Sequence, residues 1–137
     1  MKPLSILITA LLIAIMLPAT AASSERQSGG PEIEFTETVH EFGNIREDGG
    51  PVTCKFTFRN TGNAPLVIVT ASASCGCTKP KFTARPVSPG ESGEVTVTYN
   101  PLGNRGEFDK TVTVRTNIKG RKGKTVLHIT GAVIPKS

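Results

Sequence analysis

Residues 51–60 read PVTCKFTFRN, and this stretch decides the fold. Its apolar and polar side chains alternate, and the apolar ones share one face: Val52, Cys54, Phe56 and Phe58. A period of two residues is typical of an extended chain, so the stretch predicts a β-strand with one buried and one exposed face. The residues that follow, 60–65, read NTGNAP and are typical of a tight turn.

Similar alternation recurs along the rest of the chain. It predicts strands over 94–99, 108–116 and 125–134, a first strand near 32–36 and a short extended piece near Phe82. Residues 66–75 (LVIVTASASC) begin apolar on both faces, which favours a central strand. About seven antiparallel strands are therefore expected. Two packed sheets would bury their apolar faces, so we predict an all-β, immunoglobulin-like sandwich.

The first residues predict export from the cytoplasm. Lys2 precedes an apolar run over 4–17, and the small residues up to Ala21 form the pattern that signal peptidase recognises. We therefore expect residues 1–21 to be a signal peptide that is cleaved between Ala21 and Ala22. The run is shorter than the roughly 20 apolar residues that span a bilayer, so no membrane span is expected in the mature chain.

The remaining length is that of one domain. Residues 22–31 are polar and predict a disordered leader, and residues 32–134 are predicted to form a single domain. The first cysteine is Cys54, far from the cleavage site, so a lipoprotein anchor is not expected. The predicted location is the periplasm or the extracellular medium.

Positive charge is concentrated late in the chain. The sequence has 16 Lys and Arg against 11 Asp and Glu, and loss of Lys2 with the signal peptide leaves a net charge of about +4. Much of it lies in residues 119–124, KGRKGK. Such a cluster can attract an anionic partner, but no aromatic side chains interleave it as in a platform that stacks bases. We interpret it as a solvated hairpin tip and expect no nucleic-acid partner.

Several short motifs occur in a fixed order along the chain. They are His40-Glu-Phe-Gly-Asn-Ile45, Phe56-Thr-Phe-Arg-Asn-Thr-Gly62, Ala64-Pro-Leu66, Ser74-Cys-Gly-Cys-Thr78, Ser88-Pro-Gly-Glu91, Val97-Thr-Tyr99, Gly106-Glu-Phe108 and Ile129-Thr-Gly131. Over about residues 32–134 the set resembles the secreted bacterial family catalogued as domain of unknown function 1573. That family is similar to immunoglobulin-like domains of the Hydin and major-sperm-protein type. The resemblance implies the sandwich fold and no activity, because this architecture hosts many roles.

Three cysteines allow three pairings, and spacing disfavours two of them. Cys54 lies six residues before the predicted turn at 60–65, whereas Cys75 lies ten residues after it. An offset of four residues corresponds to roughly 13 Å along a strand, and a disulfide needs Cα atoms within about 7 Å. Cys54 also falls on the apolar face of its strand and has no counterpart in the resemblance. It is interpreted as a bystander in the core.

Cys75 and Cys77 are the candidate disulfide or redox pair. Gly76 between them can adopt the tight turn that brings the two thiols together. The bond would close a very small ring, and the nearby Lys79 and Lys81 would favour thiolate over thiol. The pair predicts either a local structural brace or a reactive site.

Metal binding is not expected. Two thiolates supply half of a tetrahedral zinc site. The other possible ligands are Cys54, His40, expected in a loop, and His128, expected to point outward from the last strand. These do not form a recognisable ligand set, so neither a metal nor another cofactor is predicted.

The predicted function is that of an exported, non-enzymatic binding or scaffold domain of the cell envelope with an unidentified protein partner. The chain contains no Gly-rich phosphate loop, no Gly-x-Ser-x-Gly elbow and no His-Glu-x-x-His stretch. Exposed edge strands would offer a binding mode in which a partner adds a strand. The alternative is a thiol–disulfide redox or copper- or zinc-handling accessory protein that acts through Cys75-Gly76-Cys77.

Overall fold

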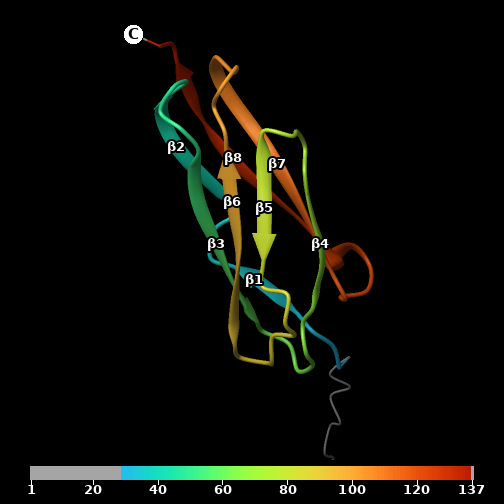
Figure 1. Cartoon of the computed structure of the whole chain (residues 1–137). Coiled ribbons are helices and arrows are strands. Elements are labelled where there is room, and N and C mark those ends of the chain that lie inside the picture. Colours follow the sequence, from blue (N-terminus) through green and yellow to red (C-terminus); the bar gives the residue numbers. More distant parts are fainter. Residues whose placement is uncertain (1–28, 137) are drawn as a thin grey trace, which may run out of the picture.

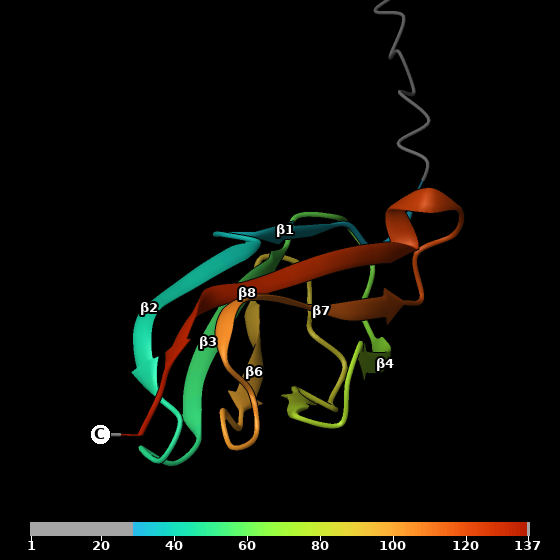
Figure 2. The same cartoon turned by 90° about the horizontal axis from the view of Figure 1, so that it is seen from above.

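The computed structural model describes residues 29–136 of the chain. The predicted signal peptide, its cleavage site at Ala21 and Ala22, and most of the predicted leader lie outside the described residues. Two four-stranded sheets face each other, one in the order β1-β3-β6-β5 and the other in the order β2-β8-β7-β4 (Figures 1 and 2). This arrangement confirms the predicted all-β, immunoglobulin-like sandwich.

The described strands number eight, and the first five alternate between the sheets, after which β6 joins β5 in one sheet and β7 and β8 lie in the other. They are β1 (Ile33–Phe35), β2 (Val39–Arg46), β3 (Val52–Asn60), β4 (Ile68–Ala73), β5 (Thr78–Phe82), β6 (Ser92–Tyr99), β7 (Gly106–Thr116) and β8 (Lys124–Ile134). A 3-10 turn, η1 (Arg121–Gly123), leads into β8. The described part of the chain contains no helix that is long and apolar enough to cross a membrane.

The core lies between the two sheets and is made by the alternating residues of their inner faces. In β3, Phe56 and Phe58 are completely buried, while the lysine, threonine and arginine side chains that alternate with them are exposed. The opposite sheet contributes buried aliphatic side chains: Val112, Val114, Leu127, Ile129 and Val133. The period of two read from the sequence therefore identifies the buried face of β3, β6, β7 and β8.

Strand β2 is the element that the sequence did not predict. It runs parallel to β8, and its register shifts between Glu41 and Asn44. Gly43 within the shift has a positive φ of 71°, a conformation that glycine adopts without strain. Because this bulge interrupts the alternation, the stretch does not have the pattern of a regular strand. His40, expected in a loop, lies on β2.

Strand β4 corrects a second expectation. Residues 66–75 were predicted as a central strand, but β4 is the outermost strand of its sheet. Leu66 and Ile68 face the core, whereas Val69 lies within the register shift between Ile68 and Thr70 and is 58% exposed. The second apolar face of the run is therefore not covered as it would be in a central strand.

Asn60 organises the turn after β3. Its side chain is completely buried and donates hydrogen bonds to the carbonyl oxygens of Ala64 (2.8 Å) and Val87 (2.9 Å). Its Oδ1 atom accepts a bond of 2.9 Å from the N–H of Gly62. These bonds satisfy the amide and fix the predicted 60–65 turn against the connection between β5 and β6.

Candidate functional site

The outer strands of the two sheets are the first places to look for a binding site. They are β1 and β5 in one sheet, and β2 and β4 in the other. An outer strand presents unpaired N–H and C=O groups to which another chain can add a strand. The four edges differ in how many of these groups remain free.

The β5 edge has lost backbone donors. The N–H of Asn100 donates to the carbonyl of Cys77 across the β5–β6 pair (2.8 Å), so by alternation Thr78 and Pro80 face the open side. The N–H of Thr78 already donates to the carbonyl of Cys75 (3.3 Å), and Pro80 has no N–H. A guest strand would find few donors there.

The edges of β1 and β2 are also poor templates. Strand β1 has only three residues. In β2, the N–H of Gly43 donates to the Glu41 carboxylate at 2.8 Å, within the bulge that shifts the strand register. Short length, bulges and edge charges are the usual means by which proteins prevent unwanted strand pairing.

The β4 edge is different. The N–H of Ser74 donates to the carbonyl of Thr111 at 2.9 Å, so Ser74 and, by alternation, Ser72 direct their backbone groups toward β7. The N–H and C=O groups of Ala71 and Ala73 therefore point to the open side. Residues 66–74 contain no charge and no proline. Among the outer strands, β4 is the one whose backbone is open to a guest strand.

The predicted cysteine pair lies at the end of this edge. Cys75 and Cys77 form a disulfide, with Cα atoms 5.4 Å apart, in the corner where the chain passes from β4 to β5. The hydroxyl of the buried Thr78 lies 3.6 Å from one sulfur and 3.7 Å from the other. Cys77 and Lys79 also line a surface hollow of about 370 Å³.

Cys54 is separate from this corner. It is a free thiol, 6% exposed, on the core face of β3. Burial, with a smaller contribution from the Glu37 carboxylate, raises the pKa of the Cys54 thiol to about 11. The thiol is therefore protonated at neutral pH and is a poor nucleophile.

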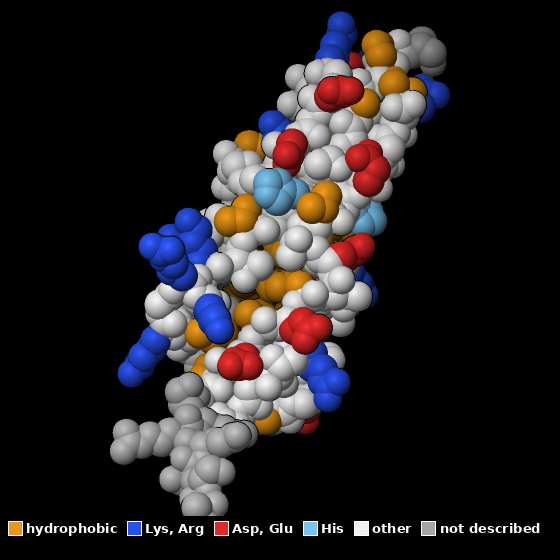
Figure 3. All heavy atoms as spheres, turned by 180° about the vertical axis from the view of Figure 1, so that it is seen from behind, with side chains coloured by type: hydrophobic (Ala, Val, Ile, Leu, Met, Phe, Trp, Pro, Cys, Tyr) orange, Lys and Arg blue, Asp and Glu red, His pale blue; other side chains and the backbone are white. Residues whose placement is uncertain are grey.

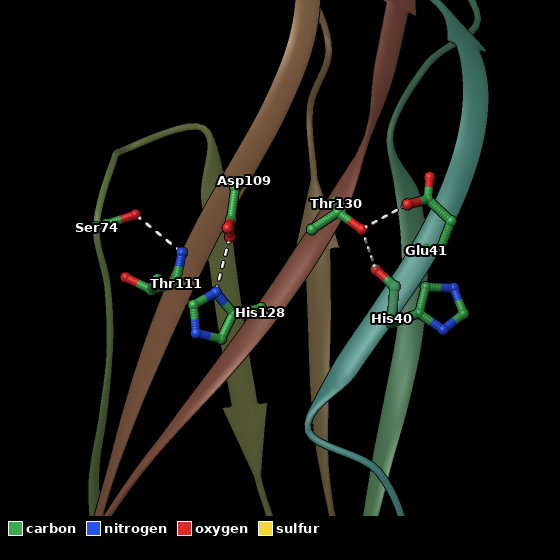
Figure 4. A network of polar contacts seen from close by, with 7 residues as sticks. All are labelled: His40, Glu41, Ser74, Asp109, Thr111, His128 and Thr130. Atoms are coloured by element: carbon green, nitrogen blue, oxygen red, sulfur yellow. Dashed lines mark hydrogen bonds and ion pairs between the residues drawn. The ribbon is translucent and has the colours of Figure 1, made fainter.

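The outer face of the β2-β8-β7-β4 sheet carries a polar network (Figures 3 and 4). Nδ1 of His128 lies 2.8 Å from Oδ1 of Asp109 on the neighbouring strand. The hydroxyl of Thr130 donates to the Glu41 carboxylate at 2.7 Å. This bond, together with the one from Gly43, lowers the pKa of Glu41. Nothing in the sequence singles out Asp109, because only the strand register places it beside His128.

The two histidines have different surroundings. His128 points outward from β8, as predicted, and has Asp109 as its partner. His40 lies 3.9 Å from Glu37 and packs edge-on against the ring of Phe42, with centroids 4.6 Å apart. Within residues 29–136, no three histidine, cysteine or acidic side chains are grouped as metal ligands.

Solved structures with the same fold come from very different organisms. A protein of unknown function from Porphyromonas gingivalis W83 superposes with a TM-score of 0.67 at 14% identity, over 77% of this chain and 48% of its own length. The ASH/PapD-like domain 7 of human CEP192 gives a TM-score of 0.61 at 10% identity, over 77% of this chain and 87% of that domain. The MSP family member WR4 of C. elegans gives 0.50 at 7% identity, over 77% of this chain and all of WR4.

These likenesses establish the fold and not the role. At such low identity, a shared sandwich is compatible with unrelated functions. The chain spans about half the length of the Porphyromonas protein, since 48% of that protein is covered. No curated protein matches the chain.

Family membership rests on the sequence of nearly the whole described domain. The matching family model extends over residues 33–133, from the first residue of β1 to the penultimate residue of β8. The resemblance noted from the motifs is thereby confirmed. The chain belongs to DUF1573, a family of proteins of unknown function.

Proposed function

We propose that this chain is an exported, non-enzymatic domain of the cell envelope that binds an extended segment of a partner protein along the β4 edge. The observation that carries the proposal is the open backbone of Ala71 and Ala73 on an uncharged outer strand. Strand addition is a common way for a sheet to recognise a peptide, because backbone hydrogen bonds supply affinity without a deep pocket.

The energetics favour a partner that also makes side-chain contacts. A typical hydrogen bond contributes a net 0.5–1.5 kcal/mol, so the backbone groups of two residues contribute only about 2–6 kcal/mol before the cost of ordering the guest. Thr70 and Ser72 project from the outer face beside the edge and are exposed. Their small side chains leave room for larger side chains of the guest strand.

The cysteine, histidine and acidic side chains that could take part in a reaction are arranged in a way that supports a non-catalytic role. Cys54 is buried and protonated, and His128 is paired with Asp109 on an open sheet face. The carboxylate of Glu41 is engaged by Thr130 and by the backbone of Gly43. These arrangements are those of a stable surface rather than of a substrate-binding cleft.

Site-specific photocrosslinking in the producing cell tests the binding mode. A photoreactive residue at Ser72 should crosslink to a partner, and Ala73→Pro, which removes one edge-facing N–H, should abolish that product. A photoreactive residue at Thr57, exposed on the outer face of the other sheet, is the matched control. A crosslink from Ser72 that survives Ala73→Pro, or the same partner captured equally from Thr57, would overturn β4 binding.

Export has its own test. The mass of the protein recovered from the periplasmic or extracellular fraction should correspond to a chain that begins at Ala22. A chain that retains Met1 and stays in the cytoplasm would refute this part of the proposal.

The disulfide corner supports a second candidate function, thiol–disulfide exchange. The favouring observation is that Cys77 borders a surface hollow that Lys79 also lines. A thiolate of a partner dithiol would attack one sulfur of the Cys75–Cys77 bond, form a mixed disulfide and release the other sulfur as a thiolate. The partner's second thiolate would then complete its own disulfide, leaving Cys75 and Cys77 reduced.

Alkylation followed by mass spectrometry discriminates the two candidates. An exchange protein should show Cys75 and Cys77 alkylated after mild treatment with a dithiol, with Cys54 unlabelled in the folded chain. If the pair remains bridged until the protein unfolds, the exchange function fails and the disulfide is a brace.

A further inference from the structure

The segment that joins β7 to β8 carries four cations. It is called the basic tip below and comprises residues 117–124, the last of which is the first residue of β8. They are Lys119, Arg121, Lys122 and Lys124, and all four are exposed. None of them forms an ion pair with a side chain in residues 29–136. Their charge is therefore available to a partner.

The basic tip accounts for the net charge of the whole described domain. Residues 29–136 contain 14 Lys and Arg against 10 Asp and Glu, an excess of four positive charges. Because the basic tip itself holds four cations and no acid, the rest of the domain is balanced. The excess of positive charge is thus equal to the charge of the basic tip, whose cations are close together in the sequence.

The basic tip has a braced backbone. The hydroxyl of Thr116 accepts a bond from the N–H of Ile118 (3.2 Å) and donates to the carbonyl of Gly123 (3.4 Å). The N–H of Gly123 donates to the carbonyl of Gly120 (3.1 Å), and a Cβ atom on Gly123 would clash with the carbonyl oxygen of Ile118. The cations therefore project from a tightly closed loop, and less ordering is needed when they bind.

The base of the loop is tied to the neighbouring strand. The side chain of Asn117 accepts a bond of 2.9 Å from the N–H of Val67 and donates one of 3.1 Å to the carbonyl of Pro65. The base of the basic tip is thus held against the segment that leads into β4.

We propose that the basic tip docks the exported domain onto an anionic lipid surface. The loop projects from the end of the β7–β8 hairpin (Figure 2), so its cations can reach a flat surface that faces this end of the domain. The segment contains no aromatic residue that would stack on bases. An anionic lipid surface attracts a nearby Lys or Arg by about 1 kcal/mol, so four clustered cations suffice for reversible association. This proposal is independent of β4.

Vesicle sedimentation with the mature protein tests the proposal. The protein should pellet with phosphatidylcholine vesicles that contain 30% phosphatidylglycerol, as an anionic fraction of about a third gives a strongly negative surface. It should stay in solution with pure phosphatidylcholine, and binding should fall as salt is raised. Replacement of the four tip cations by glutamine should weaken partitioning by several hundredfold to about a thousandfold, at about 1 kcal/mol per cation.

A second variant, in which four other cations are replaced, removes the same amount of charge from a different part of the domain and serves as the control. Lys55, Arg59, Lys79 and Lys81 are exposed on the other sheet, and their replacement by glutamine should leave most of the binding intact. Thermal unfolding of both variants checks that each is folded. Equal loss of binding in the two variants, equal binding to neutral vesicles, or retention only on immobilised polyphosphate would overturn the proposal.

Discussion

The side-chain amide of Asn60 donates a hydrogen bond of 2.9 Å to the carbonyl of Val87, and so joins the end of β3 to the connection that leads into β6. Val87 in turn pairs with Leu66 through two backbone bonds, of 2.9 and 2.8 Å. That pairing occupies the backbone N–H and C=O groups of Leu66, just before β4. The open edge of the sheet therefore begins only after Leu66.

Replacement of Asn60 by alanine should destabilise the domain by about 2–4 kcal/mol, because the partly buried backbone groups of Gly62 and Ala64 would lose this partner and the carbonyl of Val87 would keep only its bond from Leu66. Urea unfolding measures the effect. Thr61→Ala is the control, since the Thr61 side chain is exposed in the same turn and should change stability by less than about 0.5 kcal/mol. Equal losses from the two substitutions would contradict this role for Asn60.

The buried thiol of Cys54 should make stability fall at alkaline pH. Its pKa is raised from 9.0, the ordinary value of an exposed thiol, to about 11 in the folded chain, so the unfolded state loses the proton first as pH rises. Stability is unaffected below the lower value and declines between the two, by about 2 kcal/mol at pH 10.5. Unfolding at pH 8 and pH 10.5 should show this extra loss in the wild type and not in Cys54→Val. An identical decline in both proteins would mean that Cys54 does not titrate as described.

The disulfide should contribute little to global stability. Cys75 and Cys77 are two residues apart, and closing so small a ring removes only about 1.5 kcal/mol of chain entropy from the unfolded state. Replacement of both cysteines by serine should leave the chain folded, with a correspondingly small shift in denaturant midpoint. Loss of cooperative unfolding in this variant would show that the corner is essential to the sandwich.

Tyr99 should tolerate loss of its hydroxyl. The side chain is completely buried, its ring stacks on Phe108 with centroids 4.3 Å apart, and its hydroxyl has no hydrogen-bond partner in the described part of the chain. Because an unpartnered buried hydroxyl is unfavourable, Tyr99→Phe should be neutral or stabilise by up to about 1 kcal/mol. Tyr99→Leu, which also removes the stacking, should instead destabilise. A clear loss of stability in Tyr99→Phe would reveal a bound partner for the hydroxyl.

The inner faces of the sandwich follow from local sequence. In β3, Phe56 and Phe58 alternate with polar residues, and this pattern alone identifies the buried side. Strand β2 could not be recognised in this way. The bulge at Gly43 inserts one extra residue, which reverses the alternation of apolar and polar residues partway along the strand. The alternation of apolar and polar residues therefore predicts regular strands, and it fails where a bulge interrupts the strand.

The candidate sites depend on information that a local pattern does not contain. The disulfide between Cys75 and Cys77 could be anticipated, because two cysteines only two residues apart in the sequence are close in any fold. The openness of β4 depends on which strands become outermost, and that is a property of the whole topology. The pairing of His128 with Asp109 likewise needs the register between β7 and β8.

The parallel pairing of β2 with β8 has a consequence for the order of folding. Strand β8 is the last described strand to be synthesised, yet it lies between β2 and β7 inside its sheet. The sheet therefore cannot assemble until nearly the whole chain has left the ribosome, and closure over such a long loop is slow. Until then β2 has no hydrogen-bonding neighbour in its own sheet, whereas the sheet β1-β3-β6-β5 is complete once β6 has been made.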